Sequence, residues 1–259
     1  MPIAKTNAKA TVSGEVAALM KAAKELSTTV DAMEFLPPVT HVYNPLVYAW
    51  KMHCKYLSFC SGQGTQVLFL GMNPGPWGMA QTGVPFGQVE MVRDWLAIDQ
   101  PIGHPINEHP KRIIEGLACK RSEVSGARLW GLFKERFKTP AVFFKSHFVV
   151  NYCPLVFMEE SARNRTPDKL QPSEMKSLQS ACDRHLITVI ETLQPKFLVG
   201  VGAYAEQCLI RIAASTTTDS EISRKVVRIL HPSPASPAAN KDWAKIATSQ
   251  LVDGGVWRR

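Results

Sequence analysis

Three polar side chains lie close behind short apolar runs of the sequence. Asn73, Asn151 and His231 each follow the end of such a run within three residues. An amide offers both a donor and an acceptor, and an imidazole can hydrogen-bond to a developing negative charge. Singly, an asparagine after a strand is usually a turn residue, and a histidine there is more often structural than catalytic. Three of them in corresponding positions indicate a site, if the fold brings them together.

A glycine-rich segment surrounds the first of these residues. Residues 71–87 contain five Gly and three Pro among 17 residues. Glycine lets a ligand approach the main chain closely, and proline stiffens the loop, so that backbone N–H groups are exposed in fixed positions. Because an ordinary cluster of turns seldom needs so many special residues in succession, we interpret 71–87 as a binding loop.

Four short apolar runs, separated by helical patterns, are expected to position these residues. Such runs are typical of buried parallel strands in an α/β fold. Ligands bind outside the carboxyl ends of the strands of an open parallel sheet, so the polar residues would share one edge. The runs are 67–70, 148–150, 197–199 and 226–230, and 142–144 is a candidate satellite strand.

The two ends of the chain differ in character. Residues 1–14 are polar and small, so we expect disorder there, whereas 15–26 has the apolar spacing of a helix. Pro37 and Pro38 end this N-terminal region. With no internal repeat and no low-complexity tract, residues 15–259 are predicted to form a single domain.

A dinucleotide-binding pattern competes with this interpretation. Residues 200–205 match G-x-G-x-x-A, and Asp219 and Glu221 lie near the acidic position that would follow. However, only 57 residues follow Gly202, which is enough for one further strand and helix but not for two mononucleotide-binding halves. We therefore favour the interpretation that the glycines of residues 200–205 let a helix pack closely on its strand.

The basic residues are unevenly distributed. The net charge is +8, from 30 Lys and Arg against 22 Asp and Glu. Residues 105–165 carry +5 and residues 222–259 carry +5, whereas the rest of the chain carries −2. These two segments hold Asn151 and His231, so the charge favours a polyanionic partner over two ordinary solvated faces.

Cysteine spacing and hydropathy exclude several classes of protein. The six Cys form no C-x-x-C pair and no Cys/His knuckle, which argues against a disulfide framework, a zinc finger and an iron–sulfur cluster. No apolar run approaches the ~20 residues of a membrane span, and the N-terminus lacks the apolar stretch of a signal peptide. We expect a soluble, intracellular protein with reduced thiols.

Several motifs together resemble the single-strand-selective monofunctional uracil-DNA glycosylases. They are the glycine-rich loop beginning GMNPGP, the NYCP segment at 151–154, and the HPSP loop at 231–234 that continues to Lys241. YNPLVYAW, MVRDWL, EHPKR and SEVSGARLWG extend the likeness over about residues 40–250. The resemblance implies a three-layer α/β/α sandwich around a central four-stranded parallel sheet, and an enzyme that uses neither metal nor cofactor.

The resemblance also implies a pocket for a uracil base flipped out of DNA. Asn151 would pair with the base edge, Phe86 would stack on its ring, and the backbone at Met72 would add contacts. Asn73 would hold the attacking water, and His231 would stabilise the departing base anion.

The pocket is expected to tolerate larger bases. Gly75 and Met79 would leave room at the 5-position, so that 5-hydroxymethyluracil would be accepted beside uracil. Because Asn73 stands where the fastest uracil-DNA glycosylases have Asp, we expect modest turnover. No lysine is expected at the nucleophile position, which predicts a monofunctional enzyme without a lyase step.

The HPSP loop would contact DNA. Relatives carry a long basic side chain where this chain has Ala235, which predicts a weaker wedge and a preference for single strands or easily opened pairs. Serine hydroxyls would bind phosphates and a lysine would add charge. The DNA-binding residues are predicted to be Pro232, Ser233, Pro234, Ala235, Ser236 and Lys241.

The expected partner is therefore DNA, single-stranded or duplex, that contains uracil or an oxidised pyrimidine. We expect a monomer with no membrane partner, in the nucleus of a eukaryote or the cytoplasm of another cell. Two alternatives remain: a catalytically inactive basic DNA-binding module of the same fold, and a dinucleotide-dependent enzyme based on residues 200–205.

Overall fold

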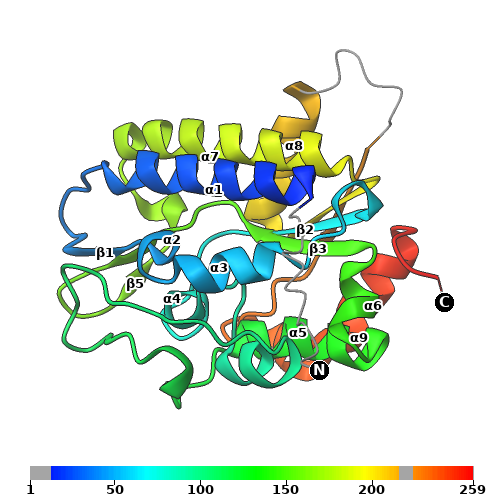
Figure 1. Cartoon of the computed structure of the whole chain (residues 1–259), viewed down its shortest axis with the longest axis horizontal. Coiled ribbons are helices and arrows are strands. Elements are labelled where there is room, and N and C mark those ends of the chain that lie inside the picture. The colour runs from blue at the N-terminus through cyan, green and yellow to red at the C-terminus, as the bar shows by residue number, and fades with distance from the viewer. Residues whose placement is uncertain (1–12, 216–223, 259) are drawn as a thin grey trace, which may run out of the picture.

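A parallel sheet of four strands forms the centre of the computed structural model, which describes residues 13–215 and 224–258 (Figure 1). The strand order is β3-β2-β6-β7, and every neighbouring pair is parallel. All four predicted runs are confirmed as strands, and β2 and β3 are buried along their whole length because helices cover both faces. The strands are β2 (Val67–Gly71), β3 (His147–Asn151), β6 (Phe197–Val201) and β7 (Lys225–Ile229).

Helices form the two outer layers. In Figure 1, α1, α7 and α8 lie on one side of the sheet, and α5, α6 and α9 lie on the other. The three-layer α/β/α sandwich predicted from the sequence is therefore confirmed. The outer helices are α1 (Gly14–Asp31), α7 (Pro172–Leu193), α8 (Ala203–Ser215), α5 (Val124–Phe137), α6 (Pro140–Phe144) and α9 (Pro237–Asp253).

A small antiparallel sheet was not predicted. It has the strand order β1-β4-β5, and its strands belong to segments that connect the main elements of the fold. Its strands are two or three residues long, which is too short for a period-two pattern to be visible in the sequence. They are β1 (His41–Tyr43), β4 (Val156–Met158) and β5 (Asn164–Arg165).

Short helical segments complete the part of the chain that the structure describes. They lie in the connections between the strands, and α4 is the one that lies within the glycine-rich loop. They are α2 (Pro45–Tyr48), α3 (Trp50–Leu57), α4 (Met79–Thr82), a π-helix (Met91–Trp95) and 3₁₀ turns at Gly62–Gly64, Gly116–Ala118 and Pro167–Lys169.

One local prediction is wrong, and the predicted N-terminal helix is confirmed with different ends. Residues 142–144 lie in α6 and not in a satellite strand, because Thr139 caps a helix whose first residue is Pro140. The N-terminal helix extends from Gly14 to Asp31, well beyond 15–26. The expected disorder does not reach residue 14, because the hydroxyl of Ser13 accepts a hydrogen bond from the backbone of Val16 and caps the helix. Residues 1–12 lie outside the described part of the chain.

The glycines of the dinucleotide-like pattern have a packing role. A Cβ at Gly200 would lie 2.5 Å from the backbone nitrogen of Glu206, so glycine is required where α8 crosses β6. Gly202 has a φ of +93° and turns the chain into α8. Asp219 and Glu221, the acidic part of the pattern, lie outside the described residues.

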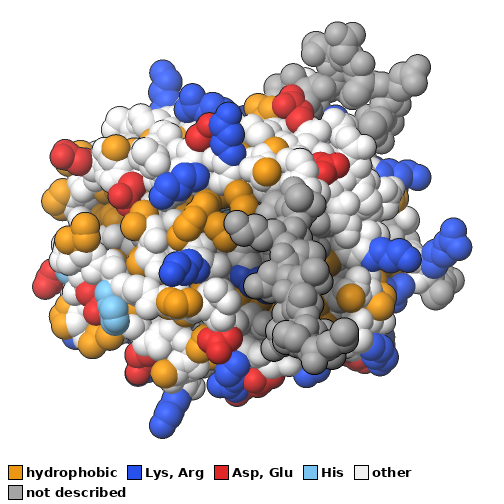
Figure 2. Space-filling view, viewed as in Figure 1, with side chains coloured by type: hydrophobic (Ala, Val, Ile, Leu, Met, Phe, Trp, Pro, Cys, Tyr) orange, Lys and Arg blue, Asp and Glu red, His pale blue; other side chains and the backbone are white. Residues whose placement is uncertain are grey.

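One face of the molecule shows no single basic patch among its described residues. On the face shown in Figure 2, Lys and Arg side chains are scattered among acidic and hydrophobic ones. Among the described residues, no helix is both long enough and apolar enough to cross a membrane.

Candidate active site

A cavity of about 290 Å³ lies at the carboxyl ends of β2, β3 and β7. It is lined by all seven residues that the sequence assigned to catalysis or base binding, and by Ser233 of the HPSP loop. The sequence analysis missed Glu123, Ser125, Asn164 and Thr166, which also line it. The parallel strand order therefore brings three distant segments of the chain to one edge, as the sequence predicted.

The glycine-rich loop is a fixed wall of this cavity. The buried side chain of Gln81 donates hydrogen bonds to the carbonyls of Pro76 (3.2 Å) and Ile113 (3.1 Å), and it accepts one from the backbone N–H of Glu115 (2.8 Å). The hydroxyl of Tyr48 donates to the carbonyl of Ala80 at 2.6 Å. The bonds to Ile113, Glu115 and Tyr48 connect the loop to two other segments of the chain and restrain it.

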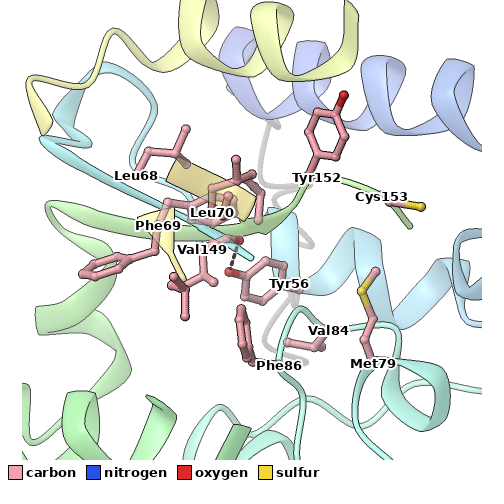
Figure 3. Packing of buried hydrophobic residues seen from close by; sticks show 14 of the residues in the cluster. Tyr56, Leu68, Phe69, Leu70, Met79, Val84, Phe86, Val149, Tyr152 and Cys153 are labelled. Carbon is pink, nitrogen blue, oxygen red and sulfur yellow. Dashed lines mark hydrogen bonds between the residues drawn. The ribbon is translucent and has the colours of Figure 1, made fainter. Parts of the chain in front are cut away.

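Phe86 forms another wall in a strained backbone conformation. Its φ is +53°, a value that residues other than glycine rarely adopt. The indole of Trp130 donates to the neighbouring carbonyl of Pro85 at 3.1 Å, and Gly126 of α5 has no side chain to displace the carbonyl of Phe86. The core holds the ring 6.4 Å from that of His231, centroid to centroid. In Figure 3, Phe86 and Tyr152 point to opposite sides of the sheet.

Asn151 ends β3 and presents an unpaired acceptor. Its Nδ2 lies 3.3 Å from Sδ of Met79. Since a thioether accepts hydrogen bonds but cannot donate them, this contact places the NH₂ group on the Met79 side. Its Oδ1 is buried and has no hydrogen-bond partner among the residues that the structure describes. A buried acceptor without a partner costs about 1–3 kcal/mol, and a ligand N–H would recover that energy.

The strands below this residue are held by a buried tyrosine. The hydroxyl of Tyr56, from α3, donates to the carbonyl of Val149 at 2.7 Å (dashed in Figure 3). Gly71 is the register partner of Asn151 in the neighbouring strand, and a Cβ there would overlap the Asn151 amide and the Phe86 ring. Glycine at position 71 is therefore what allows both side chains to meet.

His231 is held in one tautomer. Its Nδ1 accepts a hydrogen bond from the backbone N–H of Ser233 at 3.1 Å, so the proton of the neutral ring is on Nε2. Burial lowers the pKa of this imidazole below its usual 6.5. The preceding residue, Leu230, is fixed to α9 through Gln250 and Trp243. Gly202 leaves room for His231, because a Cβ at position 202 would lie 3.1 Å from the Cβ of His231.

The Asn73 amide is also oriented. Its Nδ2 donates to the carbonyl of Leu155 at 3.2 Å and lies 3.4 Å from the carbonyl of Pro74. Its Oδ1 is therefore the atom that can accept a hydrogen bond from water. An amide can orient water in this way but does not take its proton as a carboxylate would.

Glu123 is the titratable side chain that the sequence analysis overlooked. It caps α5: Oε1 accepts from the backbone of Ser125 (3.2 Å) and Oε2 from that of Gly126 (2.7 Å). Burial raises the pKa of this carboxyl, although the two backbone hydrogen bonds act in the opposite direction. An acidic residue just before a helical pattern is the signal that could have identified the cap, but not its place in the cavity.

The HPSP loop is tied to α5 and α9. Arg128 donates to the carbonyl of Pro232 (3.0 Å) and to Oδ1 of Asn240 (2.9 Å). Ser236 caps α9, which begins at Pro237. Pro234 and Ala235 lie exposed at the tip of the loop, and Lys241 is exposed in the first turns of α9.

Two arginines of the basic segment 105–165 flank the glycine-rich loop. The guanidinium carbons of Arg112 and Arg121 lie 4.9 and 4.7 Å from the ring centroid of Trp77. Cation–π contacts of this kind hold both charges against the loop that lines the cavity. Neither arginine was predicted as a site residue, because nothing in the sequence places these segments side by side.

Comparison with known proteins assigns the chain to a family. Residues 57–251 match the model of the uracil DNA glycosylase superfamily. The chain is 46% identical over 232 residues to the single-strand selective monofunctional uracil DNA glycosylases of Mus musculus, Rattus norvegicus and Bos taurus. The alignments cover 89% of this chain and 81%, 82% and 84% of those proteins.

A solved structure supports the same fold. The crystal structure of SMUG2 from Pedobacter heparinus has a TM-score of 0.61 and 14% sequence identity, and the match covers 91% of this chain and 97% of that one. With its extensive identity to three mammalian proteins and its superfamily match, the chain belongs to the single-strand selective monofunctional uracil-DNA glycosylases, a branch of the uracil DNA glycosylase superfamily.

Proposed function

We propose that this protein is a monofunctional uracil-DNA glycosylase that flips uracil out of DNA, hydrolyses its N-glycosidic bond and leaves an abasic site. The observation that carries the proposal is the buried, unpartnered Oδ1 of Asn151 beside an oriented Nδ2. Uracil presents N3–H next to O4, which complements this pair of atoms. Cytosine presents an acceptor at N3 and an amino donor at C4. Its N3 would meet the acceptor Oδ1, and its amino group would meet the donor Nδ2.

Bond cleavage requires stabilisation of the leaving base. As the bond between C1′ and N1 breaks, positive charge develops on the sugar and negative charge on the base, including O2. The Nε2–H of His231 donates a hydrogen bond to O2, and the Nδ1 contact with Ser233 keeps the proton on that side. The imidazole is neutral before the reaction and already oriented, so little reorganisation is needed.

Water supplies the oxygen that replaces the base. Asn73 Oδ1 accepts a hydrogen bond from this water and directs its oxygen toward C1′. The new bond joins the water oxygen to C1′, and the water's proton passes to solvent or to the released base. No lysine amine lines the cavity among the described residues, so the product sugar is not trapped as a Schiff base and the reaction stops at the abasic site.

The substrate range extends to uracils that carry a small 5-substituent, including 5-hydroxymethyluracil. When N3–H meets Oδ1 and O4 meets Nδ2 of Asn151, the next ring atom, C5, lies toward Met79. Gly75 presents no side chain there, and a Cβ on it would lie 3.6 Å from the nearest atom of Glu123. The cavity therefore has space beside C5 that a larger residue at position 75 would fill.

The HPSP loop and the neighbouring basic residues bind DNA. The hydroxyls of Ser233 and Ser236 accept local backbone hydrogen bonds and retain their own protons for phosphate oxygens. Lys241 and the arginines at Trp77 add positive charge. We infer an intracellular monomer that acts on DNA in the nucleus of a eukaryote or the cytoplasm of another cell.

A preference for single strands follows from the tip of this loop. Ala235 is exposed but too small to fill the position that a flipped base leaves in a duplex. The loop therefore contributes little to opening an intact base pair. We expect a uracil oligonucleotide to be cleaved faster before annealing than after it. Equal rates on single and double strands would contradict this part of the proposal.

One assay separates the proposed function from its alternatives. The protein is incubated in EDTA with an end-labelled single-stranded oligonucleotide containing one uracil, and alkali then cleaves any abasic site. We expect strand scission only after alkali. Asn73→Ala and His231→Ala should each lower the rate by about 10²–10³-fold while retaining binding.

The other outcomes identify the competing classes. Salt-sensitive DNA binding without scission would indicate the inactive basic module. Nucleotide binding without scission would indicate the dinucleotide-dependent enzyme. Either result would refute glycosylase activity.

A further inference from the structure

We propose that Trp77, Arg112 and Arg121 form a phosphate-binding subsite that holds the DNA strand beside the flipped nucleotide. The inference rests on the proposed function, because it concerns how the same protein holds the same substrate. It goes beyond a general positive charge, since it assigns one backbone phosphate of a single strand to each guanidinium.

The subsite adjoins the cavity through two segments of the chain. Trp77 follows the cavity-lining Gly75 by two residues, and Arg121 precedes the cavity-lining Glu123 by two. Two residues span at most about 7 Å of backbone. A strand whose base occupies the cavity therefore has its adjoining phosphates within reach of these side chains.

An indole and a buried tyrosine hold the two charges in place. The guanidinium carbons of Arg112 and Arg121 lie 4.9 and 4.7 Å from the ring centroid of Trp77. The hydroxyl of Tyr43 donates to the carbonyl of Arg112 at 2.9 Å, so the backbone of this arginine is fixed as well. Little conformational freedom would be lost when a ligand binds.

The protein does not neutralise either charge. Among the residues that the structure describes, no carboxylate forms an ion pair with Arg112 or Arg121, whereas four other arginines pair with Asp or Glu. The carboxylate of Glu123 accepts two backbone hydrogen bonds at the start of α5. Because both guanidiniums contact one ring, they lie within about 10 Å of each other, where 0.1 M salt screens their repulsion only in part. Bound phosphates would relieve that repulsion.

Enough hydrogen-bond donors remain to bind two phosphates. A guanidinium carries five N–H donors in a planar fork that suits phosphate. In Arg112, Nη1 donates to the carbonyl of Lys111 at 2.9 Å and Nε is buried, which leaves Nη2 for a ligand. Arg121 is exposed and presents its whole fork.

The test replaces both arginines by glutamine, which keeps a polar side chain but removes the charge. The probe is a single-stranded oligonucleotide with one tetrahydrofuran abasic analogue, and its Kd is measured by fluorescence anisotropy between about 50 and 200 mM salt. In Arg112→Gln/Arg121→Gln we expect about tenfold weaker binding at the lower salt. The slope of log Kd against log salt should fall by about 1.4, since each phosphate of a single strand contributes about 0.7.

A kinetic measurement separates binding from chemistry. On a single-stranded uracil oligonucleotide, the double variant should have a higher KM than the wild type, whereas kcat should not fall. Neither arginine touches the reacting atoms, so each would contribute equally to binding of the substrate and of the transition state.

A matched control removes two charges from the other end of α5. Lys134 and Arg136 are exposed in its last turn, about 18 Å along the helix from its start. Arg136 also contacts an indole, with its guanidinium carbon 4.4 Å from the ring centroid of Trp257. Lys134→Gln/Arg136→Gln should keep the wild-type salt slope. Arg121→Gln alone should lower that slope by about 0.7, and it tests the proposal if the double variant does not fold.

Shortening the oligonucleotide locates the phosphates. Nucleotides are removed from the 5′ side or the 3′ side of the abasic analogue, and Kd is measured again. On one of the two sides, we expect the wild type to lose more affinity than Arg112→Gln/Arg121→Gln. Equal losses for both proteins on both sides, or a double variant with the salt slope of the control, would overturn the inference. A wild-type protein that binds the uracil oligonucleotide without releasing uracil would overturn the glycosylase proposal instead.

Discussion

At the scale of single residues, the proposed base choice depends on how an amide is held rather than on its presence. In that proposal Asn151 reads uracil because Met79 orients its NH₂ group and Gly71 lets the side chain enter the cavity. An amide free to rotate would suit cytosine equally well. Similarly, His231 donates from Nε2 because Ser233 occupies Nδ1. In both cases a neighbour from the same edge of the sheet decides which atom faces the substrate.

The first prediction concerns the acceptor and donor of this amide. Asn151→Asp retains an acceptor for N3–H but replaces the donor to O4 with a second acceptor. We expect kcat/KM on uracil to fall about 10²-fold or more, and the preference for uracil over cytosine to decrease. Both bases are assayed in the same oligonucleotide. Asn164→Asp is the matched control because this exposed amide also lines the cavity; a similar loss of selectivity there would contradict the assignment.

At the scale of elements, α5 connects the core to the site. Its first turn is capped by Glu123, its Gly126 packs against the backbone of Phe86, and its Arg128 holds the HPSP loop. A single helix thus supports three walls of the cavity. A shift of its first two turns would move the stacking ring and the histidine loop together.

The second prediction compares two glycines of this helix. A Cβ at Gly126 would overlap the carbonyl of Phe86, whereas one at Gly131 would lie more than 4 Å from every atom of the described residues. Gly126→Ala should destabilise the protein by about 1–3 kcal/mol and lower uracil cleavage, because the strained Phe86 backbone must move. Gly131→Ala should stabilise it by about 0.5–1 kcal/mol through helix propensity alone.

Urea denaturation and kcat/KM on uracil measure both variants. If Gly126→Ala proved as stable and as active as Gly131→Ala, α5 would not position the stacking ring. In Gly126→Ala we expect both stability and kcat/KM to fall. In Gly131→Ala we expect stability to rise while kcat/KM stays the same.

At the scale of the whole molecule, buried neutral histidines make stability depend on pH. Burial lowers the pKa of His53, His147 and His185 from 6.5 to about 4. The native state therefore binds fewer protons than the unfolded state between these values. The contribution of these neutral histidines to the free energy of unfolding is fully present above pH 6.5. It is lost as the pH falls toward 4, by up to about 3 kcal/mol for each histidine.

The third prediction tests one of these residues. His147 accepts a hydrogen bond at Nε2 from the indole of Trp257 (3.0 Å), which fixes the C-terminal segment to β3. His147→Gln can still accept through its amide oxygen but cannot titrate. We expect its free energy of unfolding to fall less steeply than that of the wild type between pH 6.5 and 4, in urea titrations at several pH values. Parallel curves for the two proteins would mean that His147 does not contribute to the acid sensitivity.

Much of the fold was predictable because its determinants are local. Buried strands such as 67–70 read as apolar runs, and the helices between them require a parallel sheet. The errors occur where a local sequence pattern is compatible with two kinds of secondary structure. Phe143 and Phe144 are apolar because they fill the core, which is equally compatible with a strand or a short helix, and Pro140 decided for the helix.

The sequence by itself determined which residues could do chemistry and at which ends of the strands they stand. Only the tertiary structure decided how they face one another. The Asn151–Met79 contact spans 72 positions and the Arg128–Pro232 bond spans 104, and Glu123 enters the cavity only because α5 packs beside the glycine-rich loop. Amide orientation, histidine tautomer and the wall behind C5 depend on such contacts, and no local pattern encodes them because each partner lies in a distant segment.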